Sequence, residues 1–181
     1  MNSDVKQKQY PDALMVIHHR KSVRNYTGEP VTQNDVEMLL RAAMAAPSAV
    51  NCQPWEFIVV TDRKTLDALG DALPYTKMIF KAGAAIIVCA VPATAHKQLA
   101  EYAVIDSTLA SQNILLAAEA IGLGAIWTAA YPYPDRMHSV RTILNIPLEV
   151  IPLNVIPIGR PTGEDKPKDK FNPKKIHLEN W

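Results

Sequence analysis

The sequence predicts an α+β fold built around one sheet. Helical and strand-like segments alternate along 181 residues, without the regular spacing of a doubly wound parallel sheet. Hydrophobic residues make up 48% of the chain and charged residues 20%, a balance typical of a globular protein. The length is typical of one domain, so we expect residues 1–181 to form a single unit with a polar N-terminal tail at 1–10.

Hydrophobic periodicity and end signals locate the individual elements. Thr32 is a good N-cap with Asp35 three residues later, and Asp62 can cap the following helix. Segment 84–91 is apolar throughout, which is typical of a central strand buried on both faces. The expected elements are helix 12–19, helix 33–46, strand 56–61, helix 63–73, strand 84–91, helix 98–121, strand 125–129, helix 135–144 and strand 150–158.

The longest predicted helix, 98–121, ends at Gly122. Small residues lie around its whole circumference, so neighbours can approach it closely from several sides. In a chain this short, burial on every side favours another subunit as one of these neighbours. A central core helix in a monomer is the alternative.

The C-terminal tail combines prolines with charges. Pro161, Pro167 and Pro173 alternate with charged residues between 159 and 175, a composition that cannot form a packed helix. We therefore expect 160–181 to run extended over a surface, and that of a partner subunit is one candidate.

Composition excludes several classes of partner. A formal net charge of +1 gives no support to nucleic-acid binding. The longest apolar stretch is too short to cross a bilayer, and the N-terminus lacks the apolar core of a secretory signal. Cys52 and Cys89 have no second cysteine at metal or redox spacing. We expect a cytoplasmic protein with reduced thiols that binds neither nucleic acid nor membrane.

Several catalytic motifs are absent from the sequence. It contains no phosphate-binding Gly-rich loop ending in Gly-Lys-Ser/Thr and no Gly-x-Ser-x-Gly. After Gly122 and Gly124, Trp127 stands where a dinucleotide fingerprint needs its third glycine, so a helix stop and turn is the better interpretation. The adjacent His18 and His19 point in different directions around a helix, which suits no metal. Hydrolases, metalloenzymes and Rossmann dehydrogenases are all disfavoured.

Residues 20–26, here called the basic segment, form a candidate oxyanion receptor. Arg20, Lys21 and Arg24 provide three cations, and Ser22 adds a hydroxyl. In an extended chain, the side chains at 20, 22 and 24 share a face, and guanidinium groups match phosphate bidentately. Short basic runs at helix ends also favour the helix dipole, so both interpretations stay open at this point.

Residues 46–55, here called the amide loop, form a second candidate. The loop has two prolines and leads from a helix into an apolar strand. Asn51 and Gln53 offer donors and acceptors side by side, which suits a heterocycle edge with alternating carbonyls and ring nitrogens. A structural turn in which these amides bond to the backbone is equally compatible with the sequence.

Together the two segments resemble the nitroreductase family. The family's opening run, Arg-Arg-Ser-x-Arg-x-Phe/Tyr, is matched by the basic segment, and its Pro-Ser-Ala-x-Asn-x-Gln-Pro-Trp by residues 47–55. Segments 106–116, 122–127 and 156–161 also follow the family's pattern in its order, and the resemblance spans about 12–176. The family's second arginine is Lys21 here, which keeps the charge but loses the bidentate fork.

The resemblance implies a three-layer fold with a central, mostly antiparallel sheet flanked by helices, in an intertwined homodimer. FMN would lie at the subunit interface, and the tail 160–181 would pack on the partner. The implied cofactor contacts are Arg20, Lys21, Ser22 and Arg24 at the phosphate, ribityl chain and N1/C2 edge; Pro47, Ser48, Ala49, Asn51 and Gln53 from the partner; Trp127, Thr128 and Ala129 along the ring; and Arg160, or Lys168 and Lys170, returning to the phosphate.

The implied activity is that of an FMN-dependent oxidoreductase. Hydride would pass from NADH or NADPH through the flavin N5 to a small-molecule acceptor such as a nitroaromatic or quinone, with ping-pong kinetics. Arg24 or Lys21 would stabilise negative charge at the N1/C2 edge of the reduced ring. This chemistry demands no protein acid or base, so we name no catalytic residue. Roles for Cys52, or for Tyr131 and Tyr133, in shaping the site stay open.

Three other functions stay open at this point. One is a different flavin chemistry of the family, either reductive dehalogenation or flavin fragmentation. The second is a non-catalytic FMN-binding carrier or sensor, and the third is an anion-binding domain without flavin. The sequence selects neither the physiological acceptor nor one of the two nicotinamide donors.

Overall fold

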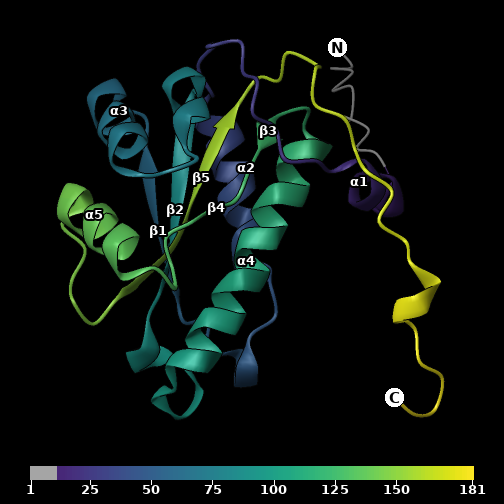
Figure 1. Ribbon diagram of the computed structural model, residues 1–181. Coiled ribbons are helices and arrows are strands. Elements are labelled where there is room, and N and C mark those ends of the chain that lie inside the picture. The colour runs from purple at the N-terminus through teal and green to yellow at the C-terminus, as the bar shows by residue number, and fades with distance from the viewer. Residues whose placement is uncertain (1–11) are drawn as a thin grey trace, which may run out of the picture.

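The computed structural model describes residues 12–181 and has three layers (Figure 1). A five-stranded sheet lies between two pairs of helices, with α3 and α5 on one face and α2 and α4 on the other. The helices are α1 (Ala13–His19), α2 (Gln33–Met44), α3 (Arg63–Ala72), α4 (Ala100–Ala120) and α5 (Pro134–Leu144). This arrangement confirms the predicted α+β class with helices flanking the sheet. The predicted polar tail, 1–10, lies outside the described residues.

The sheet is antiparallel in every strand pairing. Its order is β1-β2-β5-β3, and β4 also pairs with β5. The strands are β1 (Trp55–Val60), β2 (Ala84–Ala90), β3 (Gly124–Ala125), β4 (Thr128–Ala129) and β5 (Ile151–Gly159). Every residue of β2 is buried, as its apolar sequence predicts for a central strand.

The strand predicted over 125–129 is interrupted. β3 and β4 keep one register on β5, with Ala125 opposite Ile158 and Thr128 opposite Val155. By the same register, residue 126 faces Pro157, which has no N–H to donate to the ladder. The break therefore arises from a proline on the neighbouring strand rather than from the residues at the break.

Helix α4 is shorter and less enclosed than its sequence predicts. It begins at Ala100 because Lys97 and Gln98, just before it, have positive φ angles of 55°. Ala110 and Ala118 are fully buried against the sheet and α2, and Ala103 is fully buried beside Ala90 of β2, but the helix also has an exposed apolar face. On that face Tyr102, Ile105 and Leu109 are 36%, 56% and 39% exposed in the single chain. A second subunit on this face stays a prediction.

The basic segment lies along the edge of the sheet. The Val23 amide donates to the Ala125 carbonyl at 3.1 Å, and Tyr26 pairs with Pro161 in an antiparallel bridge. The Tyr26 hydroxyl donates to the Pro157 carbonyl at 3.0 Å, and burial raises the pKa of this phenol. Val23 packs directly on Gly124, where an added Cβ would lie 2.6 Å from a Val23 methyl. The glycine therefore lets the basic segment reach the sheet.

We predict that Gly124→Ala lowers the free energy of unfolding by about 1–3 kcal/mol, because the new methyl group overpacks against Val23. Urea unfolding measures the change. Val23→Ala also destabilises, since Val23 is 1% exposed. It removes the two methyl contacts of the clash, at 2.6 and 2.9 Å, and leaves only the contact with the Val23 Cβ at 2.7 Å. The double variant should therefore lose less stability than the sum of the two single variants. Strictly additive losses would contradict this packing.

Candidate functional site

The basic segment and the C-terminal tail enclose a hollow of about 530 Å³, here called the basic hollow. Six of its lining residues are lysine or arginine and two are acidic, so it is electropositive. It is lined by Arg20, Lys21, Ser22, Arg24, Glu164, Asp165, Lys166, Pro167, Lys168 and Lys170. The structure thus brings together six of the residues singled out in the sequence, from two segments more than a hundred positions apart.

Asp165 fastens the tail to the basic segment. Its carboxylate accepts hydrogen bonds from the backbone amides of Arg24 at 2.9 Å and Asn25 at 3.2 Å. The Thr162 amide adds a bond to the Asn25 carbonyl at 3.0 Å. Sequence reasoning missed Asp165, because nothing local distinguishes it from the other charges of the tail.

Two cations of the basic hollow differ in their pairing. Lys21 Nζ lies 3.0 Å from both carboxylate oxygens of Glu119, at the C-terminal end of α4. Arg24 donates to the Ser22 carbonyl at 3.3 Å, and no carboxylate of residues 12–181 lies within ion-pair distance of its guanidinium. The charge of Lys21 is therefore balanced within the chain, whereas that of Arg24 is not.

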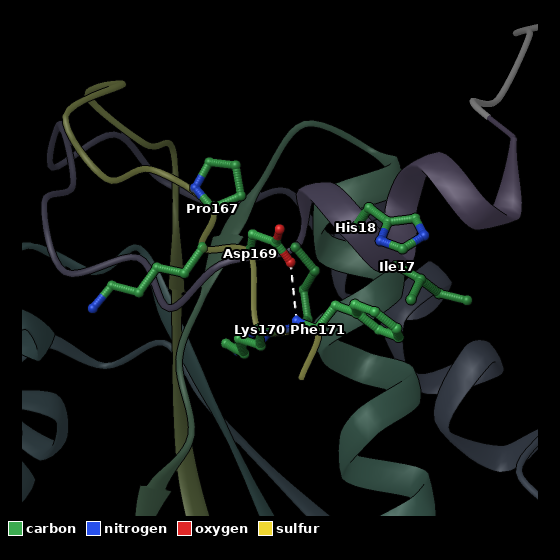
Figure 2. Close-up of a pocket in the computed structure, with 8 residues that line it drawn as sticks. Ile17, His18, Pro167, Asp169, Lys170 and Phe171 are labelled. Atoms are coloured by element: carbon green, nitrogen blue, oxygen red, sulfur yellow. Dashed lines mark hydrogen bonds between the residues drawn. The ribbon is translucent and has the colours of Figure 1, made fainter. Parts of the chain in front are cut away.

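A neighbouring hollow of about 500 Å³ lies between α1 and the tail (Figure 2). Ile17 and His18 of α1 line one side, and the tail from Pro167 to Phe171 lines the other. Inside the tail, the Phe171 amide donates to the Asp169 carboxylate at 2.9 Å, the dashed line in Figure 2. Arg20 also lines this hollow, so the tail passes over the end of α1 directly beside the basic hollow.

Arg160 forms an ion pair with α2 instead of lining the basic hollow. Its guanidinium lies 3.2 Å from the Asp35 carboxylate, which belongs to the capping box of α2. Arg160 does not line the basic hollow. The sequence left open whether Arg160, or Lys168 and Lys170, would contact the phosphate. The structure places Lys168 and Lys170 at the basic hollow, whereas Arg160 ties the end of β5 to α2.

Three hydrogen bonds that involve side chains help to hold the amide loop in a strained shape. Gln53 donates from its backbone N–H to Ser48 Oγ at 2.9 Å and from its side-chain Nε2 to Asn51 Oδ1 at 3.0 Å. The Ala49 amide donates to the buried carboxylate of Asp106 at 3.1 Å. Val50, Asn51 and Gln53 all have φ between 51° and 58°, and such backbone strain is often found at functional sites. Pro47, Asn51 and Gln53 are exposed, so the loop presents its amides outward.

One chain does not bring the amide loop to the basic hollow. Asp106 anchors the loop in the N-terminal half of α4, and Glu119 anchors Lys21 near the C-terminal end. Thirteen residues of α-helix separate these anchors by roughly 20 Å. Within a single chain, the two predicted halves of the site therefore lie near opposite ends of the same helix.

The predicted ring-side residues belong to the sheet edge. Trp127 packs against the core between the sheet and α2/α4. Thr128 Oγ1 donates to the Val155 carbonyl at 2.6 Å, and the Ala129 carbonyl accepts from Arg136 at 3.4 Å. None of the three lines the basic hollow, and the Thr128 hydroxyl is committed to the fold.

Metal-binding clusters and membrane-spanning helices are both missing from the part of the chain that begins at Asp12. It contains no group of three or more histidine, cysteine, aspartate or glutamate residues placed to hold a metal ion. None of its helices combines the length and apolarity that a membrane span requires.

Comparison with known proteins assigns the family. The protein-family sequence model described as "Nitroreductase family" matches residues 17–74 and 71–160 of this chain. The chain belongs to the nitroreductase family. A Methanothermobacter thermautotrophicus protein, provisionally named NADH dehydrogenase/NAD(P)H nitroreductase, is 43% identical over 170 residues, which cover 94% of this chain and 88% of that protein.

Solved structures agree with this assignment. A Bacteroides thetaiotaomicron protein with the same provisional name is 48% identical, with a TM-score of 0.88 over 93% of this chain and 98% of that one. An FMN-dependent nitroreductase from Clostridium difficile is 25% identical, with a TM-score of 0.85 over 93% and 99% of the two chains. The predicted nitroreductase-like fold and the expectation of an oxidoreductase of this family are confirmed.

We predict that Asp165→Ala frees the tail from the basic segment. Amide hydrogen exchange at Arg24 and Asn25 should accelerate by about 10-fold, because each amide loses a charge-assisted bond of roughly 1.5 kcal/mol. Asp165→Asn keeps one acceptor oxygen and serves as the control, with a smaller change. Unaltered exchange in Asp165→Ala would show that the tail does not depend on this carboxylate.

Proposed function

We propose that the protein is an FMN-dependent NAD(P)H oxidoreductase whose cofactor lies between two copies of the chain. The observation that carries the proposal is the basic hollow. It gathers Arg20, Ser22 and Arg24 from one end of the chain with Lys168 and Lys170 from the other. A relative described as an FMN-dependent nitroreductase shares the fold along nearly its whole length, which supports this choice of cofactor.

The donors of the basic hollow suit a phosphate monoester. Such a dianion accepts several charge-assisted hydrogen bonds, and arginine matches two of its oxygens at once. Arg20 provides such a fork, Ser22 a hydroxyl and the tail lysines two point charges. These residues would hold the FMN phosphate and ribityl chain.

Arg24 is the better candidate for the N1/C2 edge of the flavin ring. Its charge is not balanced by a carboxylate of the described chain, whereas Lys21 is neutralised by Glu119. An uncompensated guanidinium stabilises negative charge more strongly than a paired ammonium does. When bound, FMN supplies two-electron transfer, taking hydride from NADH or NADPH and passing electrons to an acceptor such as a nitroaromatic or quinone.

The partner subunit would provide the amide loop. If two copies of α4 lie antiparallel about a two-fold axis, the N-terminal half of one meets the C-terminal end of the other. That arrangement joins the amide loop of one chain to the basic hollow of its partner. It also covers the exposed face that carries Tyr102, Ile105 and Leu109.

The tail gives independent support to the dimer. Phe171, Ile176, Leu178 and Trp181 are all more than half exposed in the single chain. Figure 1 shows the tail running away from the sheet and its helices. We propose that these apolar side chains pack on the partner. We also propose that the chain forms one domain, and that it works in the reducing cytoplasm, which suits the free thiols of Cys52 and Cys89.

The first test is FMN binding followed by reduction. We expect the wild-type protein to bind FMN, and Arg20→Gln to raise the Kd about 10- to 100-fold through loss of charge-assisted bonds. Arg41→Gln is the matched control, because Arg41 is exposed and, among residues 12–181, its guanidinium pairs only with Glu37 on the surface of α2. Absorbance titration gives both constants. Equal constants for Arg20→Gln and wild type would contradict the assignment of the basic hollow.

The same samples then test turnover. Anaerobic NADH or NADPH should bleach the bound flavin band, and a nitroaromatic or quinone should restore it. A flavin that binds but never bleaches would contradict the reductase and favour a carrier or sensor. A protein that is colourless after unbound FMN has been removed would exclude both functions.

A further inference from the structure

A second electropositive hollow, of about 480 Å³, adjoins the basic hollow and shares Arg24 and Glu164 with it. Its other side is the short 3-10 helix η2 (Lys77–Lys81), so we call it the η2 hollow. It is lined by Arg24, Asn25, Tyr26, Lys77, Met78, Phe80, Lys81, Thr162 and Glu164. None of the η2 residues belongs to the sites derived above.

Two of the three cations in the η2 hollow have no ion-pair partner within residues 12–181. Three cations, Arg24, Lys77 and Lys81, face one acidic residue, Glu164. Lys77 Nζ donates to the Gly70 carbonyl at 3.0 Å and lies 3.8 Å from the Asp71 carboxylate. In the described part of the chain, no carboxylate lies within 4.0 Å of the Lys81 ammonium. The hollow therefore offers positive charge to an anion from outside.

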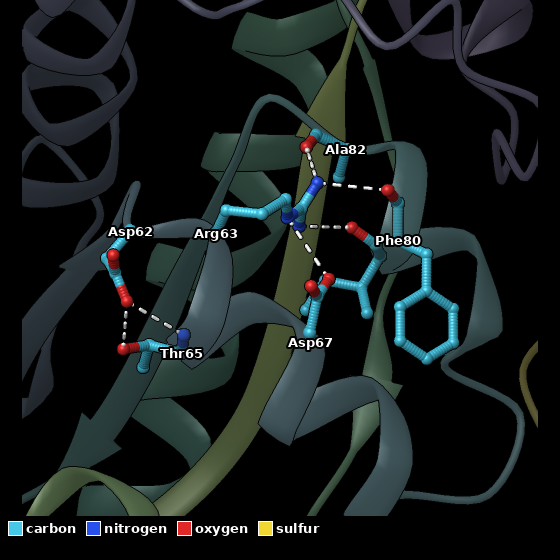
Figure 3. Close-up of polar contacts among 7 residues, drawn as sticks. Asp62, Arg63, Thr65, Asp67, Phe80 and Ala82 are labelled. Atoms are coloured by element: carbon cyan, nitrogen blue, oxygen red, sulfur yellow. Dashed lines mark hydrogen bonds and ion pairs between the residues drawn. The ribbon is translucent and has the colours of Figure 1, made fainter.

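Arg63 fixes the backbone that carries these lysines (Figure 3). Its guanidinium donates to the carbonyls of Ile79 at 2.9 Å, Phe80 at 2.9 Å and Ala82 at 3.2 Å. Its Nε also lies 3.1 Å from the Asp67 carboxylate. One side chain thus satisfies carbonyls at the C-terminal end of η2 and its cap, which fixes the backbone that carries the lysines before any ligand arrives.

Phe80 adds an aromatic surface that packs against Gly70. Its ring lies so close to Gly70 that a Cβ there would be 2.9 Å from the ring atoms. The side chain is still 37% exposed, and Lys77 Nζ is 5.3 Å from the ring centroid. An aromatic face beside ammonium groups suits a ligand that carries a heterocyclic base next to a phosphate.

We propose that the η2 hollow binds the adenosine end of NADPH, with Lys77 and Lys81 at the 2′-phosphate and Phe80 beside the adenine. This inference rests on the proposed function, in which Arg24 reaches the N1/C2 edge of the flavin. Because Arg24 lines both hollows, a donor whose nicotinamide lies on the ring has its adenosine end within reach of η2. NADH lacks the 2′-phosphate and brings no anion to either lysine, so the protein prefers NADPH.

The test compares Lys77→Gln/Lys81→Gln with wild type in the full-length, FMN-loaded protein. Loss of two charge-assisted contacts should raise the ratio of KM for NADPH to KM for NADH about 10-fold or more. Lys64→Gln is the matched control, because it removes one exposed lysine of α3 that does not line the hollow, and its ratio should equal that of wild type. An equal rise in both KM values would overturn the 2′-phosphate assignment.

A direct binding measurement separates this inference from the reductase itself. Calorimetry on the FMN-loaded wild-type protein should show adenosine 2′,5′-bisphosphate binding more tightly than 5′-AMP, and the double variant should lose that difference. Equal affinities in the wild type would overturn the inference. If neither nicotinamide donor bleaches the flavin, the proposed function fails, while the calorimetric comparison still decides what the η2 hollow binds.

Discussion

The rigid length of α4 separates the two halves of the candidate site. The helix packs on the sheet and on α2 through fully buried alanines, and its ends hold different parts of the chain. Glu119 pairs with Lys21 near the C-terminal end, and Asp106 holds the Ala49 amide in the N-terminal half. Adjustment of a loop cannot shorten roughly 20 Å of helix. A site that contains both halves therefore needs two chains.

The concentration of positive charge beside α4 depends on backbone pairing rather than on the charged side chains. Val23 and Tyr26 are buried in the core and bond to the sheet edge, so the cations between and beside them project from a fixed strand-like segment. Asp165 and Glu119 offset part of the repulsion, one by holding the tail and the other by pairing with Lys21. Arg24 keeps its charge available, and it links the basic hollow to the η2 hollow.

Local signals in the sequence predicted most of the fold. Each of these signals spans only a few consecutive residues: the Thr32–Asp35 capping box, the apolar run at β2 and the basic segment. The features that the sequence did not predict depend on contacts between residues far apart along the chain. The break between β3 and β4 comes from Pro157 across the sheet, and the pairing of Arg160 with Asp35 joins residues 125 positions apart. The η2 hollow likewise combines three separate segments, so no single stretch of sequence reveals it.

Subunit complementation tests the two-chain site most directly. One variant, Arg20→Gln/Arg24→Gln, disables the basic hollow, and another, Asn51→Asp/Gln53→Glu, disables the amide loop while keeping side chains that tolerate its backbone. Neither should reduce a quinone alone. After the two are unfolded together and refolded in equal amounts, half of the dimers combine both chains and hold one intact site, so about one quarter of the wild-type activity should return. A mixture as inactive as its parents would show that the site does not form between two chains.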